Sequence, residues 1–94
     1  MAKSTVKECE IEAELVERVE ALGGVALKAR VIGQRGFFDR LVLLPGARVL
    51  FVEVKRPKGG RMSAHQRQYA MRVSTLGLAV AVVRNSADID ALLK

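Results

Sequence analysis

The 94-residue chain is half hydrophobic and carries 16 Lys or Arg against 10 Asp or Glu, so we expect one folded domain, 1–94, rather than a disordered chain. It has no apolar run of the roughly 18 residues that would span a bilayer, and no apolar stretch follows its first residues of the kind expected in a secretory signal. Its single cysteine excludes a disulfide framework or a cysteine-based zinc site. These features indicate a reducing, cytoplasmic location, and the net charge of +6 favours a polyanionic partner, nucleic acid first.

Hydrophobic periodicity predicts a first helix from about Glu8 to Leu22, because apolar residues recur along one face of that segment. Gly23-Gly24 ends it, since glycine tolerates the left-handed conformation at a helix C-terminus. The next segments alternate in the manner of strands. We expect strands at 25–31, 38–44 and 49–55, with a basic loop at 33–36 and a turn at 45–47.

The second half of the chain begins with another basic loop, 56–61. Ser63 followed by Gln66 forms a capping-box pattern, which predicts a helix over 63–75. The apolar run 78–83 is typical of a strand covered on both faces. Ser86 is expected to cap a short terminal helix that ends near Leu93.

The elements therefore follow the order α-β-β-β-α-β-α. Only the strand–helix–strand crossover through 63–75 requires a parallel pair of strands. We therefore predict the α/β class, with a mixed sheet flanked by helices.

The strand 49–55 carries charges where a buried strand ought to be apolar. Because side chains alternate, Phe51, Glu53 and Lys55 share one face, and Val52 and Val54 the other. Burying a charge is costly unless it is paired or binds a metal. A solvated Glu–Lys ion pair at the strand end is the simpler interpretation of these two residues alone.

Asp39, at the start of the preceding strand, changes that interpretation. If the two strands form a hairpin whose paired residue numbers sum to 92, Asp39 lies opposite Glu53. That register requires a three-residue turn at 45–47. A two-residue turn would place the two carboxylates on opposite faces of the sheet.

Two carboxylates held close together repel unless a cation lies between them. Asp39, Glu53 and the main-chain carbonyl of Val54 supply three oxygens, the ligands that Mg²⁺ prefers alongside retained waters. Lys55 would point at the same site and orient or deprotonate an attacking water.

With these residues in place, the chain resembles the PD-(D/E)xK nuclease superfamily, and within it the VRR-NUC (virus-type replication-repair nuclease) branch in its stand-alone phage or bacterial form. The resemblance spans about 8–93. Its matching elements are Leu22-Gly23-Gly24, Arg35-Gly36, Asp39-Arg40-Leu41, Leu44-Pro45-Gly46, Phe51-Val52-Glu53-Val54-Lys55, Ser63 with Gln66, and Leu76-Gly77.

The resemblance implies a restriction-endonuclease-like fold and a DNA endonuclease that depends on Mg²⁺ or Mn²⁺. In that family the acidic pair binds metal and the lysine serves catalysis, which here means Asp39, Glu53 and Lys55. A glutamate of the first helix assists metal or water binding, and Glu12 is chosen because it lies eleven residues before Gly23. A glutamine of the following helix, Gln66, helps to arrange the lysine and the scissile phosphate.

Stand-alone members of the family form dimers that act on branched DNA such as four-way (Holliday) junctions. The resemblance thus implies a homodimer, DNA as partner, and the cytoplasm of a bacterial or phage-infected cell. The family usually has proline where this chain has Phe38. Proline there shapes the bend before the strand and supplies no ligand, so we expect the site to survive.

Several of these residues also have simpler interpretations. Glu12 is a solvated helix residue on sequence alone, and Gln66 a capping partner as readily as a catalytic one. Stacking on bases is one interpretation of Phe37 and Phe38, although at least one is expected in the core. His65 fits an exposed helix position, and Tyr69 fits packing better than nucleophilic attack.

Basic residues flank the acidic pair in the sequence and are predicted to hold DNA phosphates. They are Arg35, Arg40, Arg56, Lys58, Arg61 and Arg67. Two other functions remain open: a DNA-binding module on a nuclease-like fold without turnover, and a dimeric scaffold. The intact set of Asp39, Glu53 and Lys55 favours the nuclease over both.

Overall fold

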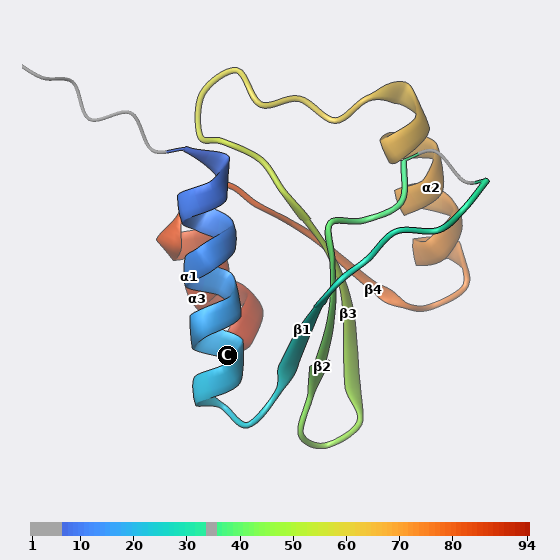
Figure 1. The fold of residues 1–94 in the computed structure, drawn as a ribbon. Coiled ribbons are helices and arrows are strands. Elements are labelled where there is room, and N and C mark those ends of the chain that lie inside the picture. The colour runs from blue at the N-terminus through green and yellow to red at the C-terminus, as the bar shows by residue number, and fades with distance from the viewer. Residues whose placement is uncertain (1–6, 34–35) are drawn as a thin grey trace, which may run out of the picture.

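The helices and strands follow one another in the predicted order. The computed structural model describes residues 7–33 and 36–94, and Figure 1 shows their arrangement. The elements are α1 (Glu8–Ala21), β1 (Val25–Lys28), β2 (Arg40–Leu44), β3 (Arg48–Val54), α2 (Ala64–Thr75), β4 (Ala79–Val83) and α3 (Ser86–Leu93). Among the described residues no helix has the length and hydrophobicity to cross a membrane. The predicted α/β class is confirmed.

The strands form one sheet in the order β1-β2-β3-β4. β1, β2 and β3 pair antiparallel, whereas β3 and β4 pair parallel because the chain crosses over through α2. The apolar strand β4 contacts α3 on one face of the sheet and α2 on the other, as predicted. It is also the outermost strand, so only Val83 in it is fully buried.

The hairpin of β2 and β3 has the predicted register. Leu43 pairs with Val49, and Leu44 with Arg48, so three residues make the turn. The turn is tight because Gly46 (φ 82°) and Ala47 (φ 62°) both adopt the left-handed region. This register brings the start of β2 to the end of β3, where the charged residues lie.

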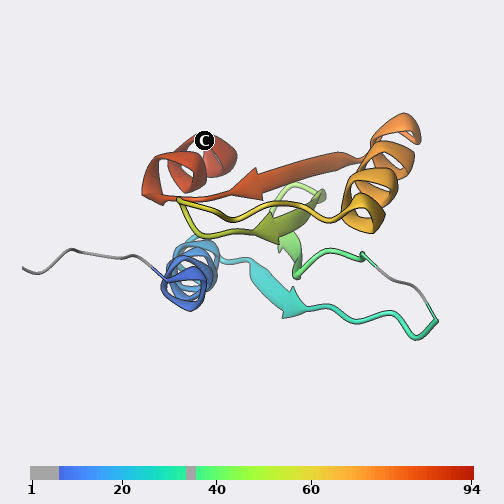
Figure 2. The same cartoon turned by 90° about the horizontal axis from the view of Figure 1, so that it is seen from above.

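The helices cover the two faces of the sheet unequally. α1 and α3 pack together on one face, and the core there includes Leu15, Val42, Val52 and Ile89. In the view from above (Figure 2), α2 lies at the opposite end of the molecule from α1 and α3. It packs against β4 on the other face of the sheet. The second face is therefore only partly covered.

Apolar side chains remain exposed on that second face. Val25, Leu43 and Val49 are direct neighbours across β1, β2 and β3, and Leu78, just before β4, continues the row. Their exposed fractions lie between 37% and 48%. We call this row the open sheet face.

The helix caps agree with the prediction at α2 and differ at α3. Ser63 caps α2, and its hydroxyl accepts a hydrogen bond from the N–H of Gln66. α3 is capped by Asn85, whose side chain accepts from the N–H of Asp88. Ser86 is instead the first helical residue, and its hydroxyl donates to Glu14. The predicted cap, Ser86, is therefore replaced by the residue directly before it.

Candidate active site

Asp39 lies one residue before β2 and is held from both sides. Its main-chain oxygen accepts a hydrogen bond from the N–H of Ala29 (3.1 Å), and its Oδ2 accepts one from the N–H of Val54 (2.8 Å). The last β2–β3 pair in the sheet is Arg40 with Val52, one step before the predicted pairing of Asp39 with Glu53. The carboxylate of Asp39, rather than a further strand residue, thus meets β3 at this end.

Glu53 is a buried acidic residue, with an exposed fraction of 1%. Its Oε2 accepts from Gln66 Nε2 at 2.5 Å and lies 3.1 Å from Lys55 Nζ. Its Oε1 is also buried but has no hydrogen-bond partner among the described residues. One oxygen of this carboxylate is therefore fully engaged, while the other is left free.

The surroundings of Glu53 disfavour its charged form. Burial, and next the negative charge of Asp39, raise the pKa of Glu53 from 4.5 to about 7, against the opposing effects of Lys55 and of the nearby main-chain N–H of Asp39. The influence of Asp39 also means that the two carboxyl groups lie close together. An additional positive charge between them would stabilise the ionised pair.

Lys55 reaches the site because it shares a strand face with Glu53, as the alternation predicted. Its side chain is largely buried. The main-chain N–H of Lys55 donates to Val83 on β4 (3.0 Å), which fixes the backbone at this point. The ammonium is thus held beside the acidic pair by both strands.

Gln66 connects α2 to the acidic pair. Its Oε1 accepts from the N–H of Ser63 (2.9 Å), and its Nε2 donates to Glu53. Gln66 is therefore a capping partner, as one interpretation predicted, and it also contacts Glu53; its catalytic role stays a prediction. The capping box orients the amide group that contacts the carboxylate.

The donor set fits a hard divalent ion. Asp39 and Glu53 provide carboxylates, and the unpartnered Oε1 of Glu53 is a buried anionic oxygen of the kind such an ion would satisfy. The main-chain carbonyl of Val54 adjoins them in sequence. In residues 7–33 and 36–94 no three Asp, Glu, His or Cys side chains form a metal-binding group. Water and substrate oxygens would have to complete the coordination, as is common for Mg²⁺.

Comparisons with known proteins show the family of this chain through one curated relative and one solved structure. No family model matches the chain. A curated protein of Acyrthosiphon pisum secondary endosymbiont phage 1, named "Putative nuclease p44", is 39% identical over 88 residues, which cover 94% of this chain and 92% of the relative. A solved structure described as "VRR_NUC domain" superposes with a TM-score of 0.87 at 32% identity, over 94% of this chain and 96% of that one. The chain belongs to the VRR-NUC nucleases.

Glu12, the helix glutamate that the VRR-NUC resemblance assigns to the site, lies elsewhere in this structure. Its Oε2 binds Arg40 Nε at 2.7 Å and Lys28 Nζ at 3.3 Å. α1 and the side chain of Arg40 lie on the face of the sheet opposite to α2. The structure therefore does not group Glu12 with Asp39 and Glu53.

The basic residues predicted to bind phosphate divide into three groups. Lys58 and Arg61 are exposed in the loop before α2, and Arg56 and Arg67 are exposed but also donate to main-chain oxygens nearby. Arg40 does not face the site, because Glu12 and the carbonyl of Ala26 hold its guanidinium. Arg35 lies outside the described residues.

Arg84 is a residue that the sequence analysis missed. It follows β4, and its Nη1 donates to the carbonyl oxygens of Gly60 and Arg56, so it ties down the loop that follows Lys55. Its own N–H donates to Asp88 (2.8 Å). No motif marks this arginine. Its position next to an apolar strand that pairs with β3 was the only available signal.

An aromatic cluster supports the site from the side of α2. Phe38 is buried and makes edge-on contacts with Phe37, Phe51 and Tyr69, with ring centroids 5.4–6.2 Å apart. The prediction that at least one of the two adjacent phenylalanines is core is confirmed, and Tyr69 packs as expected. Phe38 thus contributes packing where the family usually has proline.

His65 is exposed, as the sequence predicted for its position on α2.

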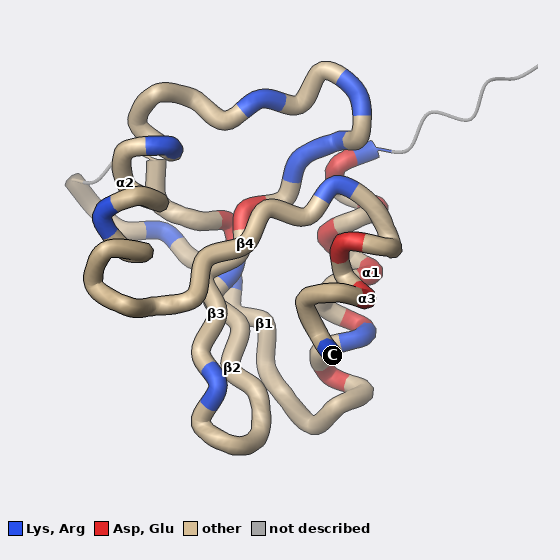
Figure 3. Tube along the Cα trace, turned by 180° about the vertical axis from the view of Figure 1, so that it is seen from behind, with Lys and Arg blue, Asp and Glu red and all other residues tan. Residues whose placement is uncertain are grey.

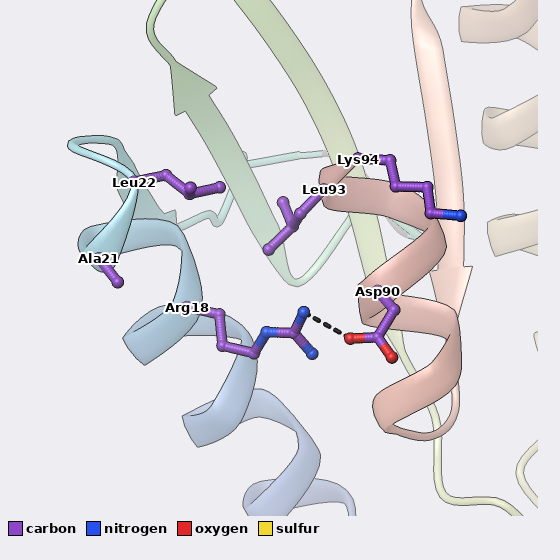
Figure 4. A pocket seen from close by; sticks show the side chains of 6 residues that line it. All are labelled: Arg18, Ala21, Leu22, Asp90, Leu93 and Lys94. Carbon is purple, nitrogen blue, oxygen red and sulfur yellow. Dashed lines mark ion pairs between the residues drawn. The ribbon is translucent and has the colours of Figure 1, made fainter.

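A pocket elsewhere in the molecule has no part in this site. It lies between the C-terminal ends of α1 and α3, where Arg18 and Asp90 form an ion pair (Figure 4). Leu22 and Leu93 contribute apolar walls. None of its lining residues belongs to the acidic pair or to the basic loop.

Charges are segregated across this VRR-NUC chain. Eight of the ten acidic residues lie in α1 and α3, and the other two are Asp39 and Glu53. Figure 3 shows the acidic helices α1 and α3 together, and basic segments on α2 and along the loop before it, which begins next to α1 and runs across to α2. A polyanion is therefore attracted to α2 and to this loop and is repelled by the acidic surfaces of α1 and α3.

Proposed function

We propose that this VRR-NUC chain is a divalent-metal-dependent DNA endonuclease that hydrolyses phosphodiester bonds in branched DNA such as four-way junctions. The observation that supports the proposal is the buried carboxylate of Glu53, whose Oε1 has no hydrogen-bond partner among the described residues while Lys55 and Gln66 hold its Oε2. We place the protein in the cytoplasm of a bacterial or phage-infected cell.

The residues have distinct roles in this proposal. Asp39, Glu53 and the Val54 carbonyl hold Mg²⁺ or Mn²⁺, which supplies Lewis-acid chemistry at the scissile phosphate when bound. Lys55 orients or deprotonates the attacking water. Gln66 fixes the engaged oxygen of Glu53. The supporting role that the family resemblance gives Glu12 stays a prediction, because its carboxylate would first have to leave Arg40.

DNA is proposed to bind over the basic side of the molecule. Lys58 and Arg61 are exposed in the loop that connects Lys55 to α2, and we propose that they bind phosphates along the approach to the acidic pair. Arg56 and Arg67 extend the same side, and Arg35 is a predicted addition. Contacts of this kind are electrostatic and weaken as salt rises.

A homodimer is proposed because one active site cuts one strand, whereas a junction cut symmetrically needs two sites. The open sheet face is the candidate interface. It is apolar, and its residues Leu43 and Val49 lie on β2, which Asp39 precedes, and on β3, which carries Glu53. Two copies joined there would present two basic sides.

The test is a cleavage panel with labelled four-way junctions, flaps, forks and duplexes, each with Mg²⁺, with Mn²⁺ and with EDTA. We expect junction cleavage that is lost with EDTA and in Glu53→Gln and Lys55→Met. Glu20→Gln, which changes an exposed glutamate of α1, is the matched control and should cleave normally.

Two results would contradict the proposal. Full activity in EDTA or in Glu53→Gln would show that the acidic pair is not the metal site. Junction binding without any cleavage in either metal would favour the non-catalytic DNA-binding module instead.

A further inference from the structure

We infer that Ser63 is a positioning residue of the active site, acting through Gln66 on the carboxylate of Glu53. The inference rests on the proposed function, because it assigns to a helix cap the task of presenting a metal ligand. It adds to that function a residue that touches neither metal nor substrate.

The argument begins with the two hydrogen bonds that Ser63 makes to Gln66. The hydroxyl of Ser63 accepts from the main-chain N–H of Gln66 (3.1 Å), and the N–H of Ser63 donates to Gln66 Oε1 (2.9 Å). The first bond fixes the backbone of Gln66 and the second fixes its side chain. Together they form the capping box at the start of α2.

This arrangement also decides which end of the amide faces the active site. A main-chain N–H can only donate, so the atom of Gln66 opposite Ser63 must be the oxygen. The amide nitrogen is then left to donate to Glu53 Oε2, as observed. If the amide turned over, an oxygen would face a buried carboxylate and repel it. The main-chain N–H of Ser63 thus excludes the wrong orientation, and its hydroxyl holds the backbone of Gln66 where the amide can reach that N–H.

A second contact holds the same turn of α2 in place. Gly36 lies so close that a Cβ there would come within 2.5 Å of the carbonyl carbon of His65 and 2.7 Å of the nitrogen of Gln66. The loop before β2, which leads to Asp39, therefore packs directly on the backbone of the residue that contacts Glu53. Both acidic residues are positioned relative to this one turn.

As a consequence, the two carboxylate oxygens of Glu53 have different contacts. Gln66 and Lys55 bind Oε2, and Oε1 remains unpartnered among the described residues. An amide that is free to turn would let the carboxylate rotate and expose either oxygen. A fixed amide holds Oε1 toward the metal position. Outer contacts of this kind typically change metal affinity or activity about 10- to 100-fold when they are removed.

The test compares two helix caps in the same protein. Ser63→Ala removes the hydroxyl, and Ser63→Thr retains both capping groups. Asn85→Ala removes the cap of α3, where no site residue is involved, and so serves as the control for loss of a cap alone. Mn²⁺ affinity is measured by calorimetry, and the side-chain NH₂ group of Gln66 is followed by NMR.

We expect Ser63→Ala to weaken Mn²⁺ binding about tenfold, with Ser63→Thr close to wild type and Asn85→Ala unchanged. The Gln66 NH₂ resonances should shift in Ser63→Ala alone. Equal Mn²⁺ affinities for Ser63→Ala and Asn85→Ala, or a Ser63→Thr as impaired as Ser63→Ala, would overturn the inference.

The NMR arm separates this inference from the proposed function. If the wild type binds no Mn²⁺, the proposed function fails. The inference is then judged on the NH₂ resonances, which must still shift in Ser63→Ala and not in Asn85→Ala. Unchanged resonances in Ser63→Ala would overturn it.

Discussion

The ammonium of Lys55 lies 3.1 Å from Glu53 Oε2, and this contact ties the proposed catalytic lysine to the proposed metal ligand. The two residues stand on one strand and share its face. Lys55 stabilises the charge on Glu53 and is also the group proposed to activate the attacking water. Removing it therefore affects both functions, and the two effects can be measured separately.

For Lys55→Met we expect junction cleavage to fall at least about 100-fold, because the group that activates the water is lost. Mn²⁺ binding should persist, since Asp39 and Glu53 remain. Single-turnover cleavage and calorimetry measure the two effects. Lys28→Met, on an exposed lysine of β1, is the control. Unreduced cleavage in Lys55→Met would remove the lysine from the mechanism.

The raised pKa of Glu53 predicts a pH dependence of metal binding. The folded-state pKa of about 7 lies above the ordinary value of 4.5, so Glu53 is protonated in the metal-free protein at mildly acidic pH. A metal ion must displace that proton. Mn²⁺ affinity should therefore rise with pH through about 7 and then level off. An affinity that is constant from pH 5.5 to pH 8 would contradict the shift.

The same shift predicts how the metal-free fold responds to pH. The folded state holds the Glu53 proton more tightly than the unfolded state does. The contribution of Glu53 to the free energy of unfolding is therefore fully present below about pH 4.5 and is lost as the pH rises through about 7. Glu53→Gln should remove this loss and, at pH 8, raise the free energy of unfolding by about 1–2 kcal/mol. Urea unfolding at pH 5.5 and 8 measures it. A variant less stable than wild type at pH 8 would contradict the prediction.

Much of the fold and of the central site was predictable from sequence, because local patterns determine them. The alternation in 49–55 identified Glu53 and Lys55 as neighbours on one face. The residues at 45–47 fixed the hairpin register, and that register carries Asp39 to the end of β3. The capping box at Ser63 predicted the start of α2.

The parts that sequence missed depend on contacts between distant segments. β4 has the composition of a buried strand, but its place at the edge of the sheet is set by the order in which strands pair. Arg40 adjoins Asp39 in sequence, yet it points toward α1 and binds Glu12. Arg84 holds a loop more than twenty residues away in the chain. No local pattern reveals such pairings.

Arg84 gives a prediction about the basic loop. Arg84→Ala removes the guanidinium that binds the carbonyls of Gly60 and Arg56, so the loop with Lys58 becomes less ordered. We expect the KM for junction DNA to rise about three- to tenfold with a smaller change in kcat. Arg72→Ala removes an equal charge from an exposed position on α2 and is the control. If Arg84→Ala and Arg72→Ala raised the KM equally, Arg84 would act through its positive charge alone and not through the order of the loop.

The open sheet face gives a prediction about assembly. Leu43→Lys places a charge at the centre of that face, and burying an unpaired charge in an interface is costly. We expect wild type to form a dimer by light scattering and Leu43→Lys to be a folded monomer. Met71→Lys, at an exposed position on α2, is the control and should remain dimeric. A monomeric wild type under cleaving conditions would rule out the dimer.

The most direct test of the central claim is anomalous diffraction from crystals of the wild type and of Glu53→Gln grown with Mn²⁺. The account predicts one strong manganese peak in the wild type, bonded to Glu53 Oε1 and to a carboxylate oxygen of Asp39, and its loss in Glu53→Gln. Manganese bound elsewhere, or no peak beside these two carboxylates at a metal concentration that supports cleavage, would contradict it.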